Sequence, residues 1–187
     1  RDSLSNGGVY SNVTTNTLNI TAATAAMNNY QYRCTVSGTC PPAVNSNAAV
    51  LTVNTAPVIT SDPANSTICE GSNTTFSITA TGAGLTYLWQ VSTNGGTTWT
   101  SLSNGGVYSN VTTNTLNITA ATAAMNNYQY RCTVNGTCPP AVNSNAAILT
   151  VNTAPAITTN PANTTICEGS NASFNISATG TGIAYLW

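Results

Sequence analysis

The chain has 187 residues, of which 41% are hydrophobic and only 4% are charged, and its formal net charge is −1. Soluble domains normally carry about a quarter charged residues, so we expect a surface that is polar but electrostatically quiet. Three arginines give no electrostatic basis for binding nucleic acid or an anionic membrane. No apolar run approaches the ~20 residues of a membrane-spanning helix, so we expect no membrane insertion in this segment.

A long internal repeat organises the sequence. Ser3–Asn54 recurs as Ser101–Asn152, 98 positions further on, with only two differences, at positions 37/135 and 50/148. Thr55–Trp89 recurs as Thr153–Trp187 with more drift. Self-similarity of this kind indicates an array of one folding unit. We therefore predict an N-terminal partial copy (1–54, the C-terminal part of a repeat), a complete copy (55–152) and a C-terminal partial copy (153–187, the N-terminal part of a repeat), cut from a longer array.

Within the complete copy, short Thr-rich segments separated by Gly, Asn and Pro predict strands. The first half alternates apolar and polar residues and turns at Gly71, at Gly82–Gly84 and at Asn94-Gly95, a pair suited to a tight hairpin. The strands predicted there span 56–60, 67–69 (a short edge segment), 74–80, 85–91 and 99–102.

The second half of the complete copy continues the pattern. Residues 107–108, 115–119, 128–134 and 145–151 predict strands, 120–127 predicts one helical turn, and 135–141 predicts a stiff loop because it contains Pro139-Pro140. Strands at 8–12-residue spacing without a long helix predict an all-β fold, with each copy closing into its own antiparallel β-sandwich.

The positions of Trp89, of Leu116-Asn117-Ile118 and of Tyr130-Arg131-Cys132 resemble an immunoglobulin-like domain. The resemblance implies that Trp89 packs in the core and that Tyr130, two residues before Cys132, forms a tyrosine corner. It also implies a cysteine opposite Cys132, but the matching position is Ile78, so we expect no inter-sheet disulfide there. The expected core comprises Trp89, Phe76, Ile78, Leu116, Ile118 and Tyr130.

Longer sequence motifs make the family resemblance more specific. Cys-Glu-Gly before the second strand, Trp-Gln-x-Ser-x-Asn-Gly-Gly, Tyr-x-Tyr-Arg-Cys and Ser-Asn-Ala-Ala-x-Leu-Thr-Val are similar to tandem immunoglobulin-like repeats of very large secreted surface proteins of Bacteroidetes, of the gliding or adhesin type. That resemblance implies type IX secretion and a location outside the cell or at its surface.

The cysteines fit disulfides in an oxidising compartment better than a metal site, because the chain has no His and no Cys-x-x-Cys pair. Each complete copy holds three, an odd number. A local Cys132–Cys138 bridge across the loop at 135–141 is one alternative. The other is a bond between the Cys69-type thiol of one copy and the Cys138-type thiol of its neighbour, since Cys69 should lie ~20 Å or more from Cys138 of its own copy. The disulfide candidates are Cys34, Cys40, Cys69, Cys132, Cys138 and Cys167.

No residue set predicts catalysis, a cofactor or a metal ion. A serine or cysteine nucleophile finds no His or Lys to activate it, and the only acids of the complete copy are Asp62 and Glu70. We expect Glu70 in a turn and Arg131 on an exposed strand face. Trp99, Tyr10 and Tyr108 are candidates for stacking on sugars, although cross-strand packing is the commoner use of such residues.

The sequence therefore predicts a non-enzymatic structural repeat protein that forms an extracellular stalk or filament at the bacterial surface. Its expected partners are neighbouring copies of itself, as a homopolymer or bundled filament, and surface glycans under the alternative of an adhesin or carbohydrate-binding array accessory to a secreted enzyme. Because Thr153–Trp187 holds the first strands of a repeat and Ser3–Asn54 the last ones, joining of chains by strand complementation is a further alternative.

Overall fold

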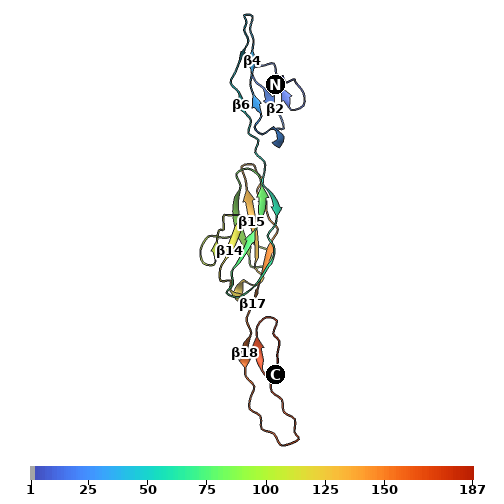
Figure 1. The fold of residues 1–187 in the computed structure, drawn as a ribbon, viewed down its shortest axis with the longest axis vertical. Coiled ribbons are helices and arrows are strands. Elements are labelled where there is room, and N and C mark those ends of the chain that lie inside the picture. Colours follow the sequence, from blue (N-terminus) through green and yellow to red (C-terminus); the bar gives the residue numbers. More distant parts are fainter. Residues whose placement is uncertain (1–2) are drawn as a thin grey trace. The chain divides into compact units, whose positions relative to one another are not determined.

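The computed structural model describes residues 3–187. These residues form strands and two short 3-10 helices, and they divide into two compact units, 3–56 and Pro57–Trp187. All of the complete copy except its first two residues lies in the second unit, and it forms a β-sandwich (Figure 1). Its elements are β7 (Val58–Ser61), β8 (Ser66–Cys69), β9 (Thr74–Ser77), β10 (Thr79–Thr81), β11 (Thr86–Ser92), β12 (Thr100–Ser101), β13 (Tyr108–Ser109), β14 (Thr115–Ile118), the 3-10 helix η2 (Ala123–Met125), β15 (Gln129–Asn135), β16 (Val142–Asn143) and β17 (Ala147–Asn152).

Two layers make the sandwich. One layer contains β13, β14 and β9 in that order, and β10 continues β9 and pairs with β7. The other layer has the order β12-β11-β15-β17-β8, with β16 also paired to β15. All of these pairs are antiparallel except β17 with β8, which run parallel. The expectation of an all-β, immunoglobulin-like sandwich is confirmed.

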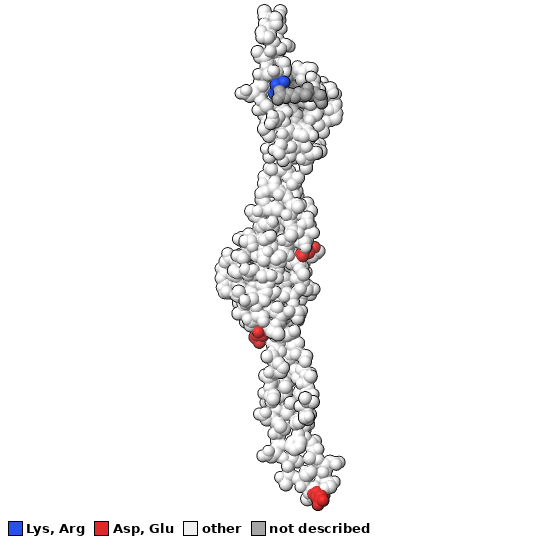
Figure 2. All heavy atoms as spheres, viewed as in Figure 1, with Lys and Arg blue, Asp and Glu red and all other residues white. Residues whose placement is uncertain are grey.

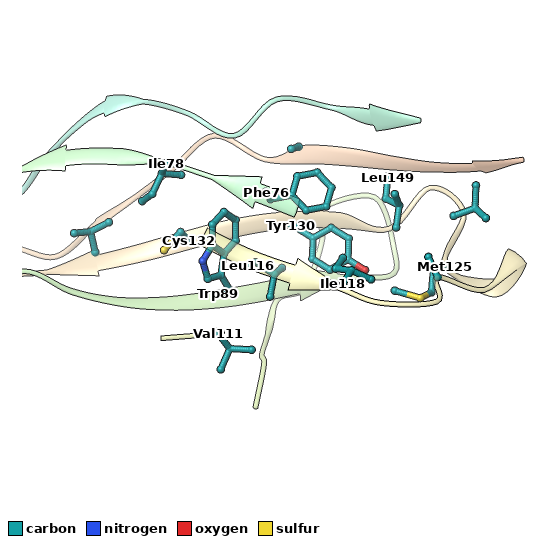
Figure 3. Packing of buried hydrophobic residues seen from close by; sticks show 14 residues of the cluster. Phe76, Ile78, Trp89, Val111, Leu116, Ile118, Met125, Tyr130, Cys132 and Leu149 are labelled. Carbon is teal, nitrogen blue, oxygen red and sulfur yellow. The ribbon is translucent and has the colours of Figure 1, made fainter. Parts of the chain in front are cut away.

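The core lies between the two layers, where inward-facing residues of both sheets meet (Figure 3). β11 and β15 pair over seven residues, and this register sets Trp89 opposite Cys132. Phe76 from β9 stacks on Tyr130 from β15, with ring centroids 5.0 Å apart. Alternation along the strands places one set of side chains inside and the other outside. The six expected core residues are all buried: Trp89, Phe76, Ile78, Leu116, Ile118 and Tyr130.

The chain enters the sandwich of the complete copy at one end and leaves it at the other; we call these ends the N-terminal and the C-terminal pole. The N-terminal pole holds Pro57 and the loops 82–85 and 136–141, which are tied by a hydrogen bond from Thr137 N to the Ala83 carbonyl (2.8 Å). The C-terminal pole holds the turn 69–73, η2 and Asn152, whose carbonyl accepts a hydrogen bond from Glu70 N (2.8 Å). The registers of β8, β17 and β15 separate the two poles by roughly 35 Å along the strands.

Each partial copy forms those strand pairs of the complete copy for which it contains both strands. Residues 3–56 form β1 (Tyr10–Ser11) with β2 (Asn19–Ile20), β3 (Gln31–Tyr32) with β6 (Ala49–Val50), and β4 (Thr35–Val36) with β5 (Val44–Asn45), together with the 3-10 helix η1 (Ala25–Met27). Residues 153–187 form the pair β18 (Ala156–Thr159) with β19 (Ser177–Thr179).

Several details differ from the expectations. The strand predicted over 74–80 is interrupted at Ile78, with a register irregularity between Thr79 and Ala80. β16 adds a short pair beyond the predicted loop. Tyr130 does not form the implied tyrosine corner: among the described residues its hydroxyl pairs with the hydroxyl of Tyr108 (3.2 Å) rather than with the backbone.

Candidate functional site

Trp89 is the central side chain of the complete copy. It is fully buried, and its indole Nε1 donates a hydrogen bond to the Thr113 carbonyl (2.9 Å), so the one polar group of the ring is satisfied inside the core. The backbone N–H of Trp89 donates to the Val111 carbonyl (2.9 Å), and the backbone N–H of Leu102 donates to the carbonyl of Trp89 (2.9 Å). The residue thus links the strand β11 to the segment after β12. This role is structural.

Cys132 is a core residue and not a nucleophile. Its side chain is buried opposite Trp89, and its backbone N–H donates to Ser144 Oγ (2.9 Å). Burial raises the pKa of the Cys132 thiol to about 11, against an opposing hydrogen bond from the backbone of Leu88. The thiolate is the reactive form of cysteine, so this side chain stays inert at neutral pH.

No disulfide joins the cysteines of residues 3–187. Cys132 lies three residues before the end of β15, and Cys138 lies three residues beyond that end, in the loop 136–141. The loop 136–141 leads into β16, which pairs back onto β15, and the local Cys132–Cys138 bridge stays a prediction.

The exposed Cys69 ends β8 at the C-terminal pole, paired in register with Asn152. Cys138 belongs to the N-terminal pole, so the two cysteines of one copy lie at opposite ends of the sandwich. Cys40 and Cys167 are exposed in the partial copies, as is Cys34, the counterpart of the buried Cys132. A bond between cysteines of successive copies stays a prediction.

A polar cluster on the outer face of β11, β12 and β15 was not predicted from sequence. The Arg131 guanidinium carbon lies 4.3 Å from the ring centroid of Trp99, and Arg131 Nε donates to Gln90 Oε1 (2.9 Å). Trp99 Nε1 in turn donates to the Gly96 carbonyl (3.1 Å). Arg131 thus covers one face of the half-buried indole. Residues 32 positions apart meet only through the strand register, so no local signal reveals the pair.

Both acids of the complete copy are used by the fold. Asp62 Oδ1 accepts the backbone N–H of Asn145 (2.8 Å), and Asp62 Oδ2 accepts Asn145 Nδ2 (2.6 Å). Glu70 Oε1 accepts the backbone N–H of Ala123 at the start of η2 (3.1 Å). Each carboxylate therefore ties two chain segments together. Glu70 lies in a turn, as expected.

The two tyrosines in the core form a hydrogen-bonded pair. Tyr108 and Tyr130 have ring centroids 6.2 Å apart in an edge-to-face arrangement, with the hydroxyl contact described above. Burial raises the pKa of both phenols, and for Tyr130 the bond to Tyr108 adds to that effect. Of the three aromatics considered for sugars, Tyr108 therefore points its polar tip at another tyrosine.

The part of the chain that the structure describes carries few charged residues. Charged atoms are few and scattered on the face drawn in Figure 2. Within residues 3–187, no three His, Cys, Asp or Glu side chains gather as metal ligands. Neither 3-10 helix of this part of the chain is long or apolar enough to cross a membrane.

Solved structures support the fold. An I-band fragment of titin has a TM-score of 0.68 and 16% sequence identity over 95% of this chain, and the chain covers 62% of that fragment. The N-terminal four Ig domains of Dscam1 give a TM-score of 0.52 at 19% identity, over 98% of this chain and 49% of theirs. Sidekick-1 immunoglobulin domains 1–5 give 0.50 at 23% identity, over 87% and 35%. The fold is therefore immunoglobulin-like. Sequence identities this low show the fold alone and give no information on function.

No curated protein matches the sequence significantly. A family model matches residues 59–153, which is just over half of the chain and nearly the whole complete copy. The match begins inside β7 and ends one residue after β17, so the family is defined on one sandwich. The chain belongs to the family described as Domain of unknown function (DUF8696).

Proposed function

We propose that this chain is a non-enzymatic spacer: a stretch of tandem immunoglobulin-like repeats in an extracellular stalk or filament at the bacterial surface. The observation that carries the proposal is that the chain enters the complete copy at one pole and leaves it at the other. An array of such copies gains length with every repeat.

The connection between copies supports a spacer role. β17 ends at Asn152 and β18 begins at Ala156, so three residues, Thr153–Pro155, join them. Pro155 fixes its own φ near −65° and restricts the residue before it. A connection of this length and composition limits the swing of one copy on the next, which suits an extended stalk better than a flexible chain of beads.

The nearly uncharged surface supports association of neighbouring copies in a homopolymer or bundled filament. Like charges that would repel parallel stalks are missing, because the complete copy carries only Arg131, Asp62 and Glu70. All three are held by partners within the copy, as described above. Lateral contacts would instead use the hydroxyl and amide groups of Thr, Ser and Asn.

The proposed location rests on the sequence resemblance to repeats of large secreted surface proteins of Bacteroidetes. The resemblance implies delivery by type IX secretion. The exposed cysteines suit an oxidising compartment outside the cytoplasm. No role in catalysis is proposed, because the described nucleophiles lack an activating base and the most buried thiol is inert.

Labelling of cells tests this function directly. Antibodies against residues 57–152 should label intact producing cells, and immunogold images should show label along thin projections. Labelling that appears only after the cells are permeabilised would contradict the proposal.

An adhesin or carbohydrate-binding array is the second candidate, and the half-buried Trp99 beside Arg131 and Gln90 favours it. An aromatic ring bordered by hydrogen-bonding groups is a common element of sugar sites. A glycan array probed with the 187-residue chain should then show binding that Trp99→Ala abolishes. If the chain binds no glycan on the array, the adhesin candidate is rejected and the spacer function is the one that stands.

A further inference from the structure

The polar cluster on the outer face of β11, β12 and β15 extends into a network that crosses four strands. Thr133 Oγ1 of β15 donates to Asn143 Oδ1 of β16 (2.6 Å) and lies 3.5 Å from Gln90 Oε1 of β11. Gln90 Oε1 also accepts Arg131 Nε, and Gln90 Nε2 lies 3.5 Å from Ser101 Oγ of β12. Strand register brings these groups together, because Gln90 pairs with both Arg131 and Ser101. The sheet therefore holds a fixed set of polar groups on its solvent side, where Ser101 and Asn143 are exposed.

Arg131 is oriented by this cluster but has no anion beside it. Its Nε is bound to Gln90, and its guanidinium carbon lies 4.3 Å from the ring centroid of Trp99. Within residues 3–187, no group accepts a hydrogen bond from its two terminal nitrogens, Nη1 and Nη2. Asp62 and Glu70, the two acids of the complete copy, accept backbone N–H groups elsewhere. Arg131 thus presents a positioned, positively charged pair of terminal nitrogens to solvent.

The chemistry of this arrangement selects a carboxylate. A planar guanidinium binds a carboxylate through two parallel hydrogen bonds, and one arginine matches the single charge of one carboxylate. Nucleic acids and anionic membranes instead gain affinity from many cationic contacts, which a copy with one arginine does not offer.

The neighbours of Arg131 select a sugar that carries the carboxylate. The amide and hydroxyl groups of Gln90, Ser101 and Asn143 can exchange hydrogen bonds with sugar hydroxyls. The half-buried Trp99 leaves part of its ring to pack against the apolar side of a pyranose. A uronic acid combines a carboxylate, hydroxyls and a pyranose ring in one unit, so it matches all three kinds of group.

We propose that the outer-face cluster binds glycans that contain uronic acids, with the sugar carboxylate on Nη1 and Nη2 of Arg131 and sugar hydroxyls on Gln90, Ser101 and Asn143. This inference rests on the adhesin candidate given above and names its ligand class. A single site of this kind is weak, because it is open to solvent and carries one charge. Several copies that engage one polymer bind more tightly through the raised effective concentration.

Nuclear magnetic resonance titration of the 187-residue chain tests the site. Trigalacturonate and trimannuronate are the probes, with their methyl esters as matched sugars without charge and a glutamate tripeptide as carboxylates without sugar. At least one uronate should shift the Trp99 indole N–H and the Arg131 Nε–H resonances. The Trp89 indole, which is buried and bound to the Thr113 carbonyl, should stay in place and so report an intact fold. The esters and the tripeptide should bind much more weakly.

Variants of Arg131 separate the fork from its charge. Arg131→Gln should weaken uronate binding by about 10-fold or more, as expected when hydrogen bonds to a charged group are lost. Arg131→Lys keeps the charge but not the paired donors, so it should lose most of the binding too. Arg33→Gln is the charge-matched control, because the exposed Arg33 has neither the glutamine bond nor the aromatic contact of Arg131, and it should bind like the unmodified chain.

Resonances that stay fixed with both uronates would overturn the proposal. Equal binding of the methyl esters would do so too, and it would leave an adhesin for neutral sugars standing. Equal binding of the glutamate tripeptide would overturn the sugar assignment in favour of an acidic protein partner. Full binding by Arg131→Gln would place the ligand elsewhere on the chain. The spacer function is unaffected by any of these results, since labelling of cells tests it separately.

Discussion

At the residue scale, the repeat provides internal comparisons. Trp89 and Trp187, or Cys132 and Cys34, share nearly the same local sequence, yet one of each pair is buried and the other exposed. Local propensity therefore does not decide their burial; the presence of the partner strands does. The core residues could be named from sequence because they alternate along predicted strands. The Asp62–Asn145 and Arg131–Trp99 contacts could not, because they join segments through tertiary structure.

Trp89→Phe should destabilise the complete copy by about 2–4 kcal/mol. The substitution removes buried volume and leaves the Thr113 carbonyl without its donor in the core. Chemical denaturation followed by circular dichroism would measure this loss. Trp187→Phe, the same change at an exposed equivalent, should leave the unfolding of the complete copy unchanged, and equal effects of the two substitutions would contradict the role given to Trp89.

The complete copy should lose stability at alkaline pH through Tyr130. Its pKa is raised above the ordinary value of 10.0 by burial, so below pH 10 both the folded and the unfolded states hold the proton and the stability is fully present. Above pH 10 the unfolded state releases the proton first, and the free energy of unfolding should fall by about 1.4 kcal/mol per pH unit for this group. Denaturation curves recorded between pH 8 and 12 would measure the slope.

Tyr130→Phe should reduce that slope, at the cost of the bond to Tyr108, about 1 kcal/mol at neutral pH. An unchanged slope in this variant would show that other groups cause the alkaline loss.

At the scale of elements, side-chain clamps hold the strands that begin the sandwich. β7 and β8 are short. Between them, Asp62 bonds to Asn145, just before β17, and Asn65 Oδ1 accepts the backbone N–H of Ile148 within β17 (2.8 Å). The sequence predicted these strands from Thr-rich segments and prolines. It did not predict that β8 pairs in parallel with β17, because nothing in a short segment indicates which edge it joins.

Asp62→Ala should destabilise the complete copy by about 1–2 kcal/mol, because it removes two hydrogen bonds that link β7 to the segment before β17. Asp62→Asn should cost less, since one amide oxygen can still accept the backbone N–H of Asn145. Thermal unfolding monitored by calorimetry would rank the variants. Asn160→Ala, at the equivalent position of the C-terminal partial copy, is the control and should not change the stability of the complete copy. An Asp62→Ala protein that is as stable as this control would contradict the stabilising role given to the bonds between Asp62 and Asn145.

At the scale of the whole molecule, two observations together predict disulfides between copies. Each complete copy has an odd number of cysteines, and Cys69 and Cys138 lie at its opposite poles. If copies follow one another head to tail, the Cys69-type position of one copy faces the Cys138-type position of the next. Between two chains, the pairs of this kind are Cys69 with the partner's Cys40, and Cys167 with the partner's Cys138. This pairing would leave the exposed Cys34 and the buried Cys132 as thiols.

Oxidation of the associated chain with glutathione disulfide should therefore give covalent oligomers, with each protein disulfide forming as two thiols reduce the glutathione disulfide to two glutathione thiols. Fragment mapping without reductant should find the Cys69–Cys40 and Cys167–Cys138 linkages, and Cys69→Ser should remove the first. Exclusive linkage of Cys132 to Cys138 would contradict the inter-copy pairing.

The central claim is that each repeat closes into its own sandwich and that closure, not local sequence, creates its stability. Hydrogen exchange of the dilute chain tests it most directly, using fragments that cover Gln129–Gly136 and Gln31–Gly38, which differ only at positions 135 and 37. We predict strong protection of the amides of β15, which lies between β11 and β17, and rapid exchange in the N-terminal partial copy, where the partner of β11 type is missing. Equal protection of the two fragments in the monomer would contradict the account.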